Sequence, residues 1–348
     1  QGEIWIFFFE YEASIAGNTF LTMRQGCAGF FTHQEIQDNR GLVLTDEDLA
    51  PKTGRRGPEV RDLLPLRSGS YSEEQVEALR RGDLVTCFGP DFEGLSLASP
   101  VALPGGLLRL IHRVPECDPR GGRWGLGMVR AEADVHPDDW YLTCHFVDDM
   151  VMPGTLMYEC CAHALRFLLT RMGWVGEADR LAYEPVPGVH AGLKCRGPVT
   201  RNTKVVCYQV EIKEIGYRPE PYVVADAMMF ADGTRIVGFQ DISMQVTGTT
   251  GQELERLWAA RKPGGLPVQP SSGASTPPEP GSPVIPWDLA PGSTPKVPEG
   301  PPSRPAGHRG DPIRPALYNR GSLLQFATGL PSQAFGPHFQ AFDQRFIA

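Results

Sequence analysis

The sequence contains no segment that predicts a membrane-spanning helix. Its most apolar stretch, residues 155–169, is short for a bilayer and is interrupted by Glu159, His163 and Arg166. Basic residues are also comparatively few: 33 Lys and Arg stand against 41 Asp and Glu, and no stretch stands out as a basic cluster. We therefore expect neither a nucleic acid nor an anionic membrane as a partner.

The 348-residue sequence also lacks CxxC pairs and a signal-like N-terminus. Without CxxC or close Cys/His pairs no zinc site is predicted, and the eight cysteines are expected to be buried free thiols of a reducing cytosol. The sequence begins without Met and stops after Ala348 in a strand-like run. We therefore expect a cytoplasmic protein, and a piece of a longer chain.

Pro, Gly and Ser saturate residues 262–320. Such a stretch cannot bury enough apolar surface to fold, which is typical of a flexible interdomain linker. A weak repeat lies on either side of it, because residues 87–92 read CFGPDF and residues 334–339 read AFGPHF. This repeat predicts tandem modules.

We predict five parts along the chain. The aromatic-rich runs 3–12 and 19–31, separated by a turn at Gly17-Asn18, indicate an antiparallel hairpin. Ser72 is the expected N-cap of a short helix in the connection that follows. The parts are the C-terminal strands of a preceding module (1–45), a connection with a short helix (46–83), one complete domain (84–250), a linker (251–320) and the start of a following module (321–348).

The pattern of the central domain predicts an α+β fold. Strands, one long helix and then a run of antiparallel strands differ from the regular alternation that gives a parallel sheet. The helix has almost no polar face, so a curled sheet must cover most of its sides. The expected elements are strands at 107–114 and 124–135, a helix at 155–172, and strands at 204–215, 222–230 and 234–246 with turns at Gly216 and Asp232-Gly233.

His145 and Glu159 are the strongest candidates for catalysis. A histidine takes up a proton near neutral pH, and a carboxyl group in an apolar helix is expected to be pushed towards its protonated form. Between them, Pro153 suits the first helical turn and Gly154 allows a ligand to approach the backbone. The amides of Gly154 and Thr155 would then stabilise an oxyanion at the positive end of the helix.

The run 140–159 and its domain resemble the β-hydroxyacyl-acyl-carrier-protein dehydratases of fatty acid synthesis, which have the hotdog fold. The resemblance rests on WYLTCHF at 140–146, Asp149, VMPG at 151–154, and Glu159. The CHF and VMPG elements are similar to the branch that also isomerises the double bond, although that branch carries Asp at the position of Glu159. The wider layout resembles the dehydratase region of a polyunsaturated fatty acid or polyketide synthase, where hotdog modules occur in tandem.

The resemblance implies a role for each motif residue. His145 removes the α-proton of a (3R)-3-hydroxyacyl thioester, Glu159 protonates the departing hydroxyl, and the Val151 carbonyl fixes the histidine tautomer. It also implies an acyl carrier protein as partner, and a homodimer or a pseudo-dimer with an adjacent module. No organic cofactor or metal is implied. The implied substrate-binding residues are Gly154, whose amide holds the thioester oxygen, Thr155, Val151 and Phe146.

Other interpretations stay open. Asp148 and Asp149 could form a carboxylate pair, but we expect them to cap the loop, because Asp bonds readily to nearby backbone amides. His163, on the same helix face as Glu159, is expected to be packed or hydrogen-bonded and not a second base. Two rival functions are an acyl-thioesterase, which would activate water with its carboxylate, and a non-catalytic acyl-binding module. The intact pair of His145 and Glu159 argues against the latter.

Overall fold

The computed structural model describes most of the chain up to residue 261. The described residues are 5–31, 34–35, 38, 41–98, 101–145, 150–218, 220–261, 321–322 and 342–343. The chain divides into two compact units, Gln1–Pro263 with Tyr318–Ala348, and Gly264–Leu317. The second unit, the predicted linker at 262–320 and the repeat at 334–339 all lie outside the described residues.

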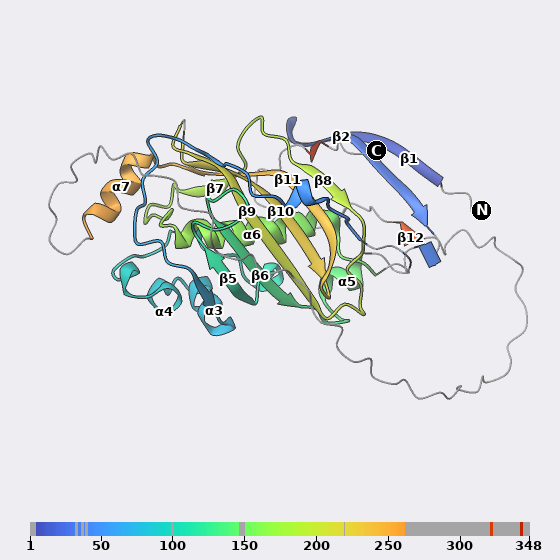
Figure 1. Cartoon of the computed structure of the whole chain (residues 1–348), viewed down its shortest axis with the longest axis horizontal. Coiled ribbons are helices and arrows are strands. Elements are labelled where there is room, and N and C mark those ends of the chain that lie inside the picture. The colour runs from blue at the N-terminus through green and yellow to red at the C-terminus, as the bar shows by residue number, and fades with distance from the viewer. Residues whose placement is uncertain are drawn as a thin grey trace, which may run out of the picture. The chain divides into compact units, whose positions relative to one another are not determined.

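The main body is a nine-stranded, largely antiparallel sheet packed against one long helix (Figure 1). Its longest strands are consecutive in sequence and adjacent in space, as antiparallel strands joined by short turns are. The spatial order is β4 (Gly69–Tyr71), β5 (Arg113–Asp118), β6 (Met128–Asp134), β9 (Val205–Gly216), β10 (Tyr222–Ala231), β11 (Thr234–Thr247) and β7 (Ala182–Glu184), with β3 (Arg55–Arg56) beside β9 and β8 (Gly192–Cys195) beside β11.

The long helix is α6, Gly154–Arg171, and it runs behind the strands in Figure 1. Its buried residues include Leu156, Leu165 and Phe167, and it packs against β6, β9, β10 and β11. A helix with so wide an apolar surface is stable only when it is covered in this way. The predicted α+β hotdog fold is therefore confirmed.

The three long strands that follow the helix, β9 to β11, agree closely with the prediction, whereas the short strands β7 and β8 were not predicted and the strand predicted at 107–114 is wrong over most of its length. At the β10–β11 turn, Asp232 and Gly233 have φ angles of 47° and 83°, as a tight hairpin requires. Residues 106–108 form a 3₁₀ turn, η3 (Gly106–Leu108), and β5 begins only at Arg113. Gly106 has a φ of 61°, which strands do not adopt, so the Gly-Gly pair before the leucines prevents the strand from starting there.

Short helices complete the described elements. Ser72 caps α3 with a capping box, as predicted. The helix α7 lies inside the range predicted as linker, and its Trp258 is buried and donates to the Gly173 carbonyl at 2.7 Å, so this helix packs as part of the domain. These helices are α2 (Asp46–Leu49), α3 (Glu73–Arg80), α4 (Leu84–Phe88), η1 (Pro90–Phe92), η3 (Gly106–Leu108), α5 (Trp140–Cys144) and α7 (Gly251–Ala259).

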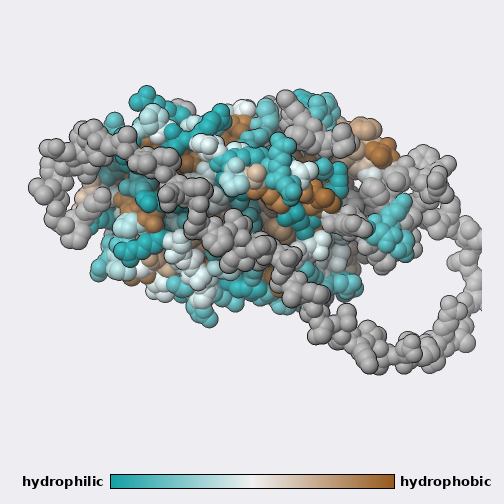
Figure 2. Space-filling view, viewed as in Figure 1, coloured by the Kyte–Doolittle hydropathy of each residue, from teal (hydrophilic) through white to brown (hydrophobic). Residues whose placement is uncertain are grey.

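The predicted N-terminal hairpin is present as β1 (Trp5–Ile15) and β2 (Asn18–Phe31). It belongs to a second sheet, in which β12 (Gly321–Ser322) and β13 (Phe342–Asp343) pair with β2. Ile6, Phe8 and Ile15 are exposed by 56, 73 and 57 %, and hydrophobic surface is visible in the region of this hairpin (Figure 2). Exposed apolar side chains grouped in this way mark a surface that contacts another structure.

Arg171 joins the end of α6 to the connecting segment, which leads to a stability prediction. The side chain is buried and donates to the Tyr71 hydroxyl and to the carbonyls of Arg67 and Pro65, at 3.0, 3.0 and 3.3 Å. Arg171→Met removes the buried guanidinium and leaves the Tyr71 hydroxyl and the two carbonyls without this donor, which should lower the free energy of unfolding by about 3 kcal/mol in urea denaturation. The control Arg120→Met breaks an exposed ion pair and should cost below about 1 kcal/mol. Equal losses would contradict the prediction.

Candidate functional site

His145 ends the short helix α5, and its ring is fixed by the segment that leads into α6. Its Nδ1 lies 2.8 Å from the Val151 carbonyl, and the Val151 amide donates to the His145 carbonyl at 3.0 Å. A carbonyl can only accept, so Nδ1 carries the proton of the neutral ring. Nε2 is then the nitrogen that takes up a proton, and the side chain is 5 % exposed. The contact expected between these two residues is therefore present.

The segment carrying Val151 is held by the connection between β8 and β9. The Met152 amide donates to the Val199 carbonyl at 2.9 Å, and Val151 forms an isolated antiparallel bridge with Thr200. Because Val151 in turn holds His145, the β8–β9 connection supports the position of the imidazole. These contacts lie directly before the first turn of α6 in the chain.

The N-terminus of α6 is open. Gly154 is the first helical residue and Pro153 is the N-cap, one position earlier than predicted, and proline has no side-chain oxygen to accept the first amides. A Cβ added at Gly154 would meet no atom of the described residues within 4 Å, so these residues leave space in front of the helix. The Thr155 hydroxyl oxygen is buried without a hydrogen-bond partner among the described residues. Helix amides beside free space form an anion site.

Glu159 pairs with His163 one turn along the helix. Glu159 Oε1 lies 2.9 Å from His163 Nε2, and the two side chains are 13 % and 0 % exposed. Burial raises the pKa of Glu159, but the hydrogen bond and charge of His163, aided by Arg166, outweigh it and hold this pKa below the ordinary value. Burial lowers the pKa of His163, a shift that Glu159 opposes and Arg166 and Arg80 reinforce. The expectation that the environment of Glu159 favours its protonated form is therefore wrong.

Some of the site residues predicted from the sequence have contacts in the structure, and others lie outside the described residues. Val151 lies against His145, and Glu159 lies against His163, whose packing is as expected. Phe146 and the pair Asp148-Asp149 lie outside the described residues. The influence of His163 on Glu159 was missed, although their spacing of four residues on a helix is the signal for such a contact.

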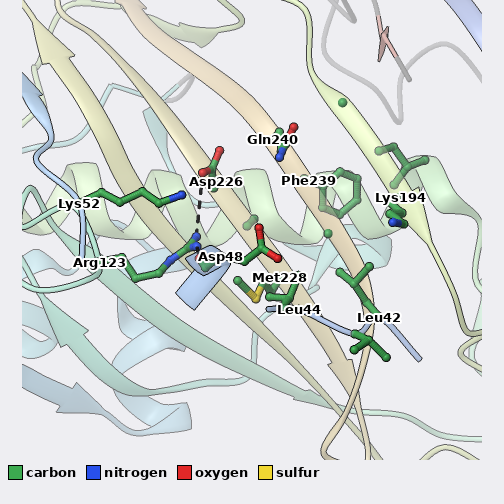
Figure 3. A pocket seen from close by; sticks show the side chains of 15 residues that line it. Leu42, Leu44, Asp48, Lys52, Arg123, Lys194, Asp226, Met228, Phe239 and Gln240 are labelled. Atoms are coloured by element: carbon green, nitrogen blue, oxygen red, sulfur yellow. Dashed lines mark hydrogen bonds and ion pairs between the residues drawn. The ribbon is translucent and has the colours of Figure 1, made fainter. Parts of the chain in front are cut away.

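A separate pocket of about 220 Å³ lies elsewhere on the sheet. In Figure 3 its side chains stand in front of the strands while α6 runs behind them, and Lys52 and Arg123 point towards Asp226. Arg123 forms ion pairs with Glu211 and Asp226, and Lys213 forms one with Asp226. These two cations and two carboxylates therefore neutralise one another. Neither His145 nor Glu159 lines this pocket, and its paired charges indicate a structural network.

Other kinds of site find no support in the part of the chain that the structure describes. None of its His, Cys, Asp or Glu side chains form a group of three that could hold a metal ion. None of its helices is long and apolar enough to cross a membrane. All eight cysteines are free, as predicted, but only five are buried, because Cys27 and Cys195 are half-buried and Cys144 is exposed.

Comparison with known proteins identifies the domain. Residues 103–240 match the model of the FabA-like domain. The chain is 34 % identical over 234 residues to one of the subunits of the polyunsaturated fatty acid synthase of Thraustochytrium sp., a match that covers 65 % of this chain. The chain spans 15 % of the length of that relative.

Two solved structures are also similar in part. One is a hypothetical thioesterase with coenzyme A from Streptococcus pneumoniae, which is 15 % identical, covers 35 % of this chain and 80 % of its own, and gives a TM-score of 0.27. The other is smu.793 from Streptococcus mutans bound to acetyl CoA, with 12 % identity, 35 and 82 % coverage and a TM-score of 0.26. At these TM-scores neither carries an argument about function. The match to the FabA-like model does bear on the chemistry, and residues 103–240 form a FabA-like domain.

Proposed function

We propose that this domain dehydrates (3R)-3-hydroxyacyl chains on an acyl carrier protein to trans-2-enoyl chains in fatty acid or polyketide synthesis. The observation that carries the proposal is the His145 imidazole, whose Nδ1 is fixed by the Val151 carbonyl beside the open N-terminus of α6. The similarity to part of a polyunsaturated fatty acid synthase supports the substrate class.

In the proposed mechanism, His145 is the base. Its Nε2 removes a proton from the carbon next to the thioester carbonyl, and negative charge moves onto the carbonyl oxygen. The amides of Gly154 and Thr155, at the positive end of α6, stabilise that charge. The double bond then forms as the C3–O bond breaks.

The departing hydroxyl needs a proton, and the pair of Glu159 and His163 supplies it. Because the pKa of Glu159 lies below its ordinary value, the carboxyl group is mostly ionised near neutral pH. The pair must therefore bind one extra proton, which passes through Glu159 to the hydroxyl and leaves as water. The proton on His145 returns to the pair after product release, so that the cycle closes with one water lost per chain.

We further propose the modular organisation that the sequence predicts. The exposed apolar side chains of β1 support the assignment of residues 1–45 to a preceding hotdog module, joined by the connection 46–83. The domain at 84–250, extended to 261 by α7, would form a homodimer or a pseudo-dimer with a neighbouring module. The predicted linker 251–320 would begin only after α7, which occupies Gly251–Ala259, and would lead to a following module from residue 321.

The proposal is tested by incubating the protein with a 3-hydroxyacyl chain on an acyl carrier protein. Dehydration lowers the mass of the loaded carrier by one water, whereas a thioesterase releases free carrier thiol. Chromatography of the released chains separates trans-2-enoyl products from isomerised ones and so reports isomerase activity. Thiol release without water loss would reject the dehydratase.

Gly154→Ala tests whether the space beside Gly154 is required for substrate binding without being required for folding. The added methyl group meets no atom of the residues that the structure describes, so the free energy of unfolding should change by less than about 1 kcal/mol. The same methyl group occupies the space in front of the helix amides, and kcat/KM for dehydration should fall by about 10-fold or more. Urea denaturation and steady-state kinetics measure the two effects. Unchanged kinetics would show that the substrate does not approach this position.

A further inference from the structure

The segment 194–204 is the most basic part of the site region. It reads KCRGPVTRNTK and contains four cations, Lys194, Arg196, Arg201 and Lys204, and no carboxylate, in a chain with a net charge of −8. The expectation that no stretch forms a basic cluster overlooks it, because the four cations are spread over eleven residues. Such a local excess of one sign creates a field that attracts the opposite charge.

The basic segment is attached directly to the candidate site. It includes the end of β8 and the β8–β9 connection, and its Val199 and Thr200 pair with Met152 and Val151. Val151 holds the imidazole of His145. The cations therefore lie within a few residues of the backbone that positions the proposed base.

The charges of Arg201 and Lys204 are available to a partner. Both side chains are exposed, and neither forms an ion pair in the described part of the chain. Two carboxylates lie close by in the fold: Asp232 accepts the backbone amides of Lys204 and Val205, and Asp134 pairs with Arg113. Among the described residues neither forms an ion pair with Arg201 or Lys204, and exposed cations outside ion pairs contribute to the encounter with an anionic partner.

We infer that the basic segment 194–204 is the docking surface for the acidic protein domain that delivers the acyl chain. This inference rests on the proposed function, because a thioester-bound substrate must be presented next to His145 by the protein that carries it. A protein partner fits better than a membrane or nucleic acid, since the excess charge is confined to one short segment of an acidic chain.

The test combines the double substitution Arg201→Glu and Lys204→Glu with two forms of one substrate. The 3-hydroxybutyryl group is supplied on a negatively charged acyl carrier protein and on N-acetylcysteamine, which has no docking surface. We expect KM for the carrier substrate to rise about 10-fold or more and its dependence on salt to flatten. Kinetics with the N-acetylcysteamine substrate should not change.

The control Arg67→Glu reverses the charge of an exposed arginine on the connecting segment and should leave both substrates unaffected. An unchanged KM for the carrier, or an equal loss with both substrates, would overturn the inference. So would binding to anionic phosphatidylserine vesicles that the double variant alone loses. Fluorescence anisotropy of labelled carrier tests docking without turnover, so the inference can fail or hold even if the wild-type protein dehydrates neither substrate.

Discussion

Replacing His145 by Ala is expected to lower kcat for dehydration by about 10³-fold, because general-base catalysis contributes roughly 10²- to 10⁴-fold. The imidazole is 5 % exposed and its Nδ1 is fixed by Val151, so the ring is already oriented before substrate binds. The loss should appear in kcat more than in KM, since the base acts in the transition state. Mass spectrometry of the loaded carrier measures the rate of water loss.

A matched control distinguishes lost chemistry from lost structure. His190 is exposed and lies outside the site, so His190→Ala should dehydrate the carrier-bound chain at the wild-type rate. Circular dichroism and urea denaturation should show that His145→Ala still folds. Wild-type activity in His145→Ala would place the base elsewhere. If thiol release continued while water loss was never detected, the thioesterase interpretation would replace the dehydratase.

The central helix and its sheet could be predicted because their signals are local and strong. From Leu156 to Leu169 the sequence has almost no polar face, and only burial on all sides satisfies such a helix. The hairpin at Asp232-Gly233 follows from turn chemistry that few other sequences satisfy. Most of the strand expected at 107–114 is absent, because three leucines and an isoleucine indicated a strand whereas Gly106, with a positive φ, starts a 3₁₀ turn there.

The electrostatic state of the site could not be predicted in the same way. Helical spacing places His163 beside Glu159, but the sign of the shift in the Glu159 pKa depends on the balance between burial and its partners. To determine which effect is larger, one must know where Arg166 and the covering sheet lie relative to Glu159, and the sequence does not give these positions. The link from Val199 through Met152 towards His145 likewise joins segments about fifty residues apart, and no local pattern indicates it.

Glu159→Gln is expected to reduce kcat by about 10²-fold or more, because the amide cannot deliver a proton to the departing hydroxyl. Glutamine keeps the size of the side chain and can still hydrogen-bond to His163, so the fold should be unaffected. The rate of water loss from the carrier-bound chain is the measurement. Glu159→Asp should retain part of the activity, since it keeps an acid on a shorter side chain. Equal rates for Glu159→Gln and the wild type would remove Glu159 from the mechanism.

His163→Leu tests how the proton is held. An acid works while it is protonated, so the rate falls as pH rises through the pKa of the acid, and a lowered pKa places this fall at low pH. Leucine removes the hydrogen bond and charge that lower the pKa of Glu159 and leaves burial, which raises it. The fall in kcat/KM should therefore move to higher pH in His163→Leu, and less in His163→Gln, which can still donate to the carboxylate. A profile that moved to lower pH, or did not move, would mean that His163 does not set the ionisation of Glu159.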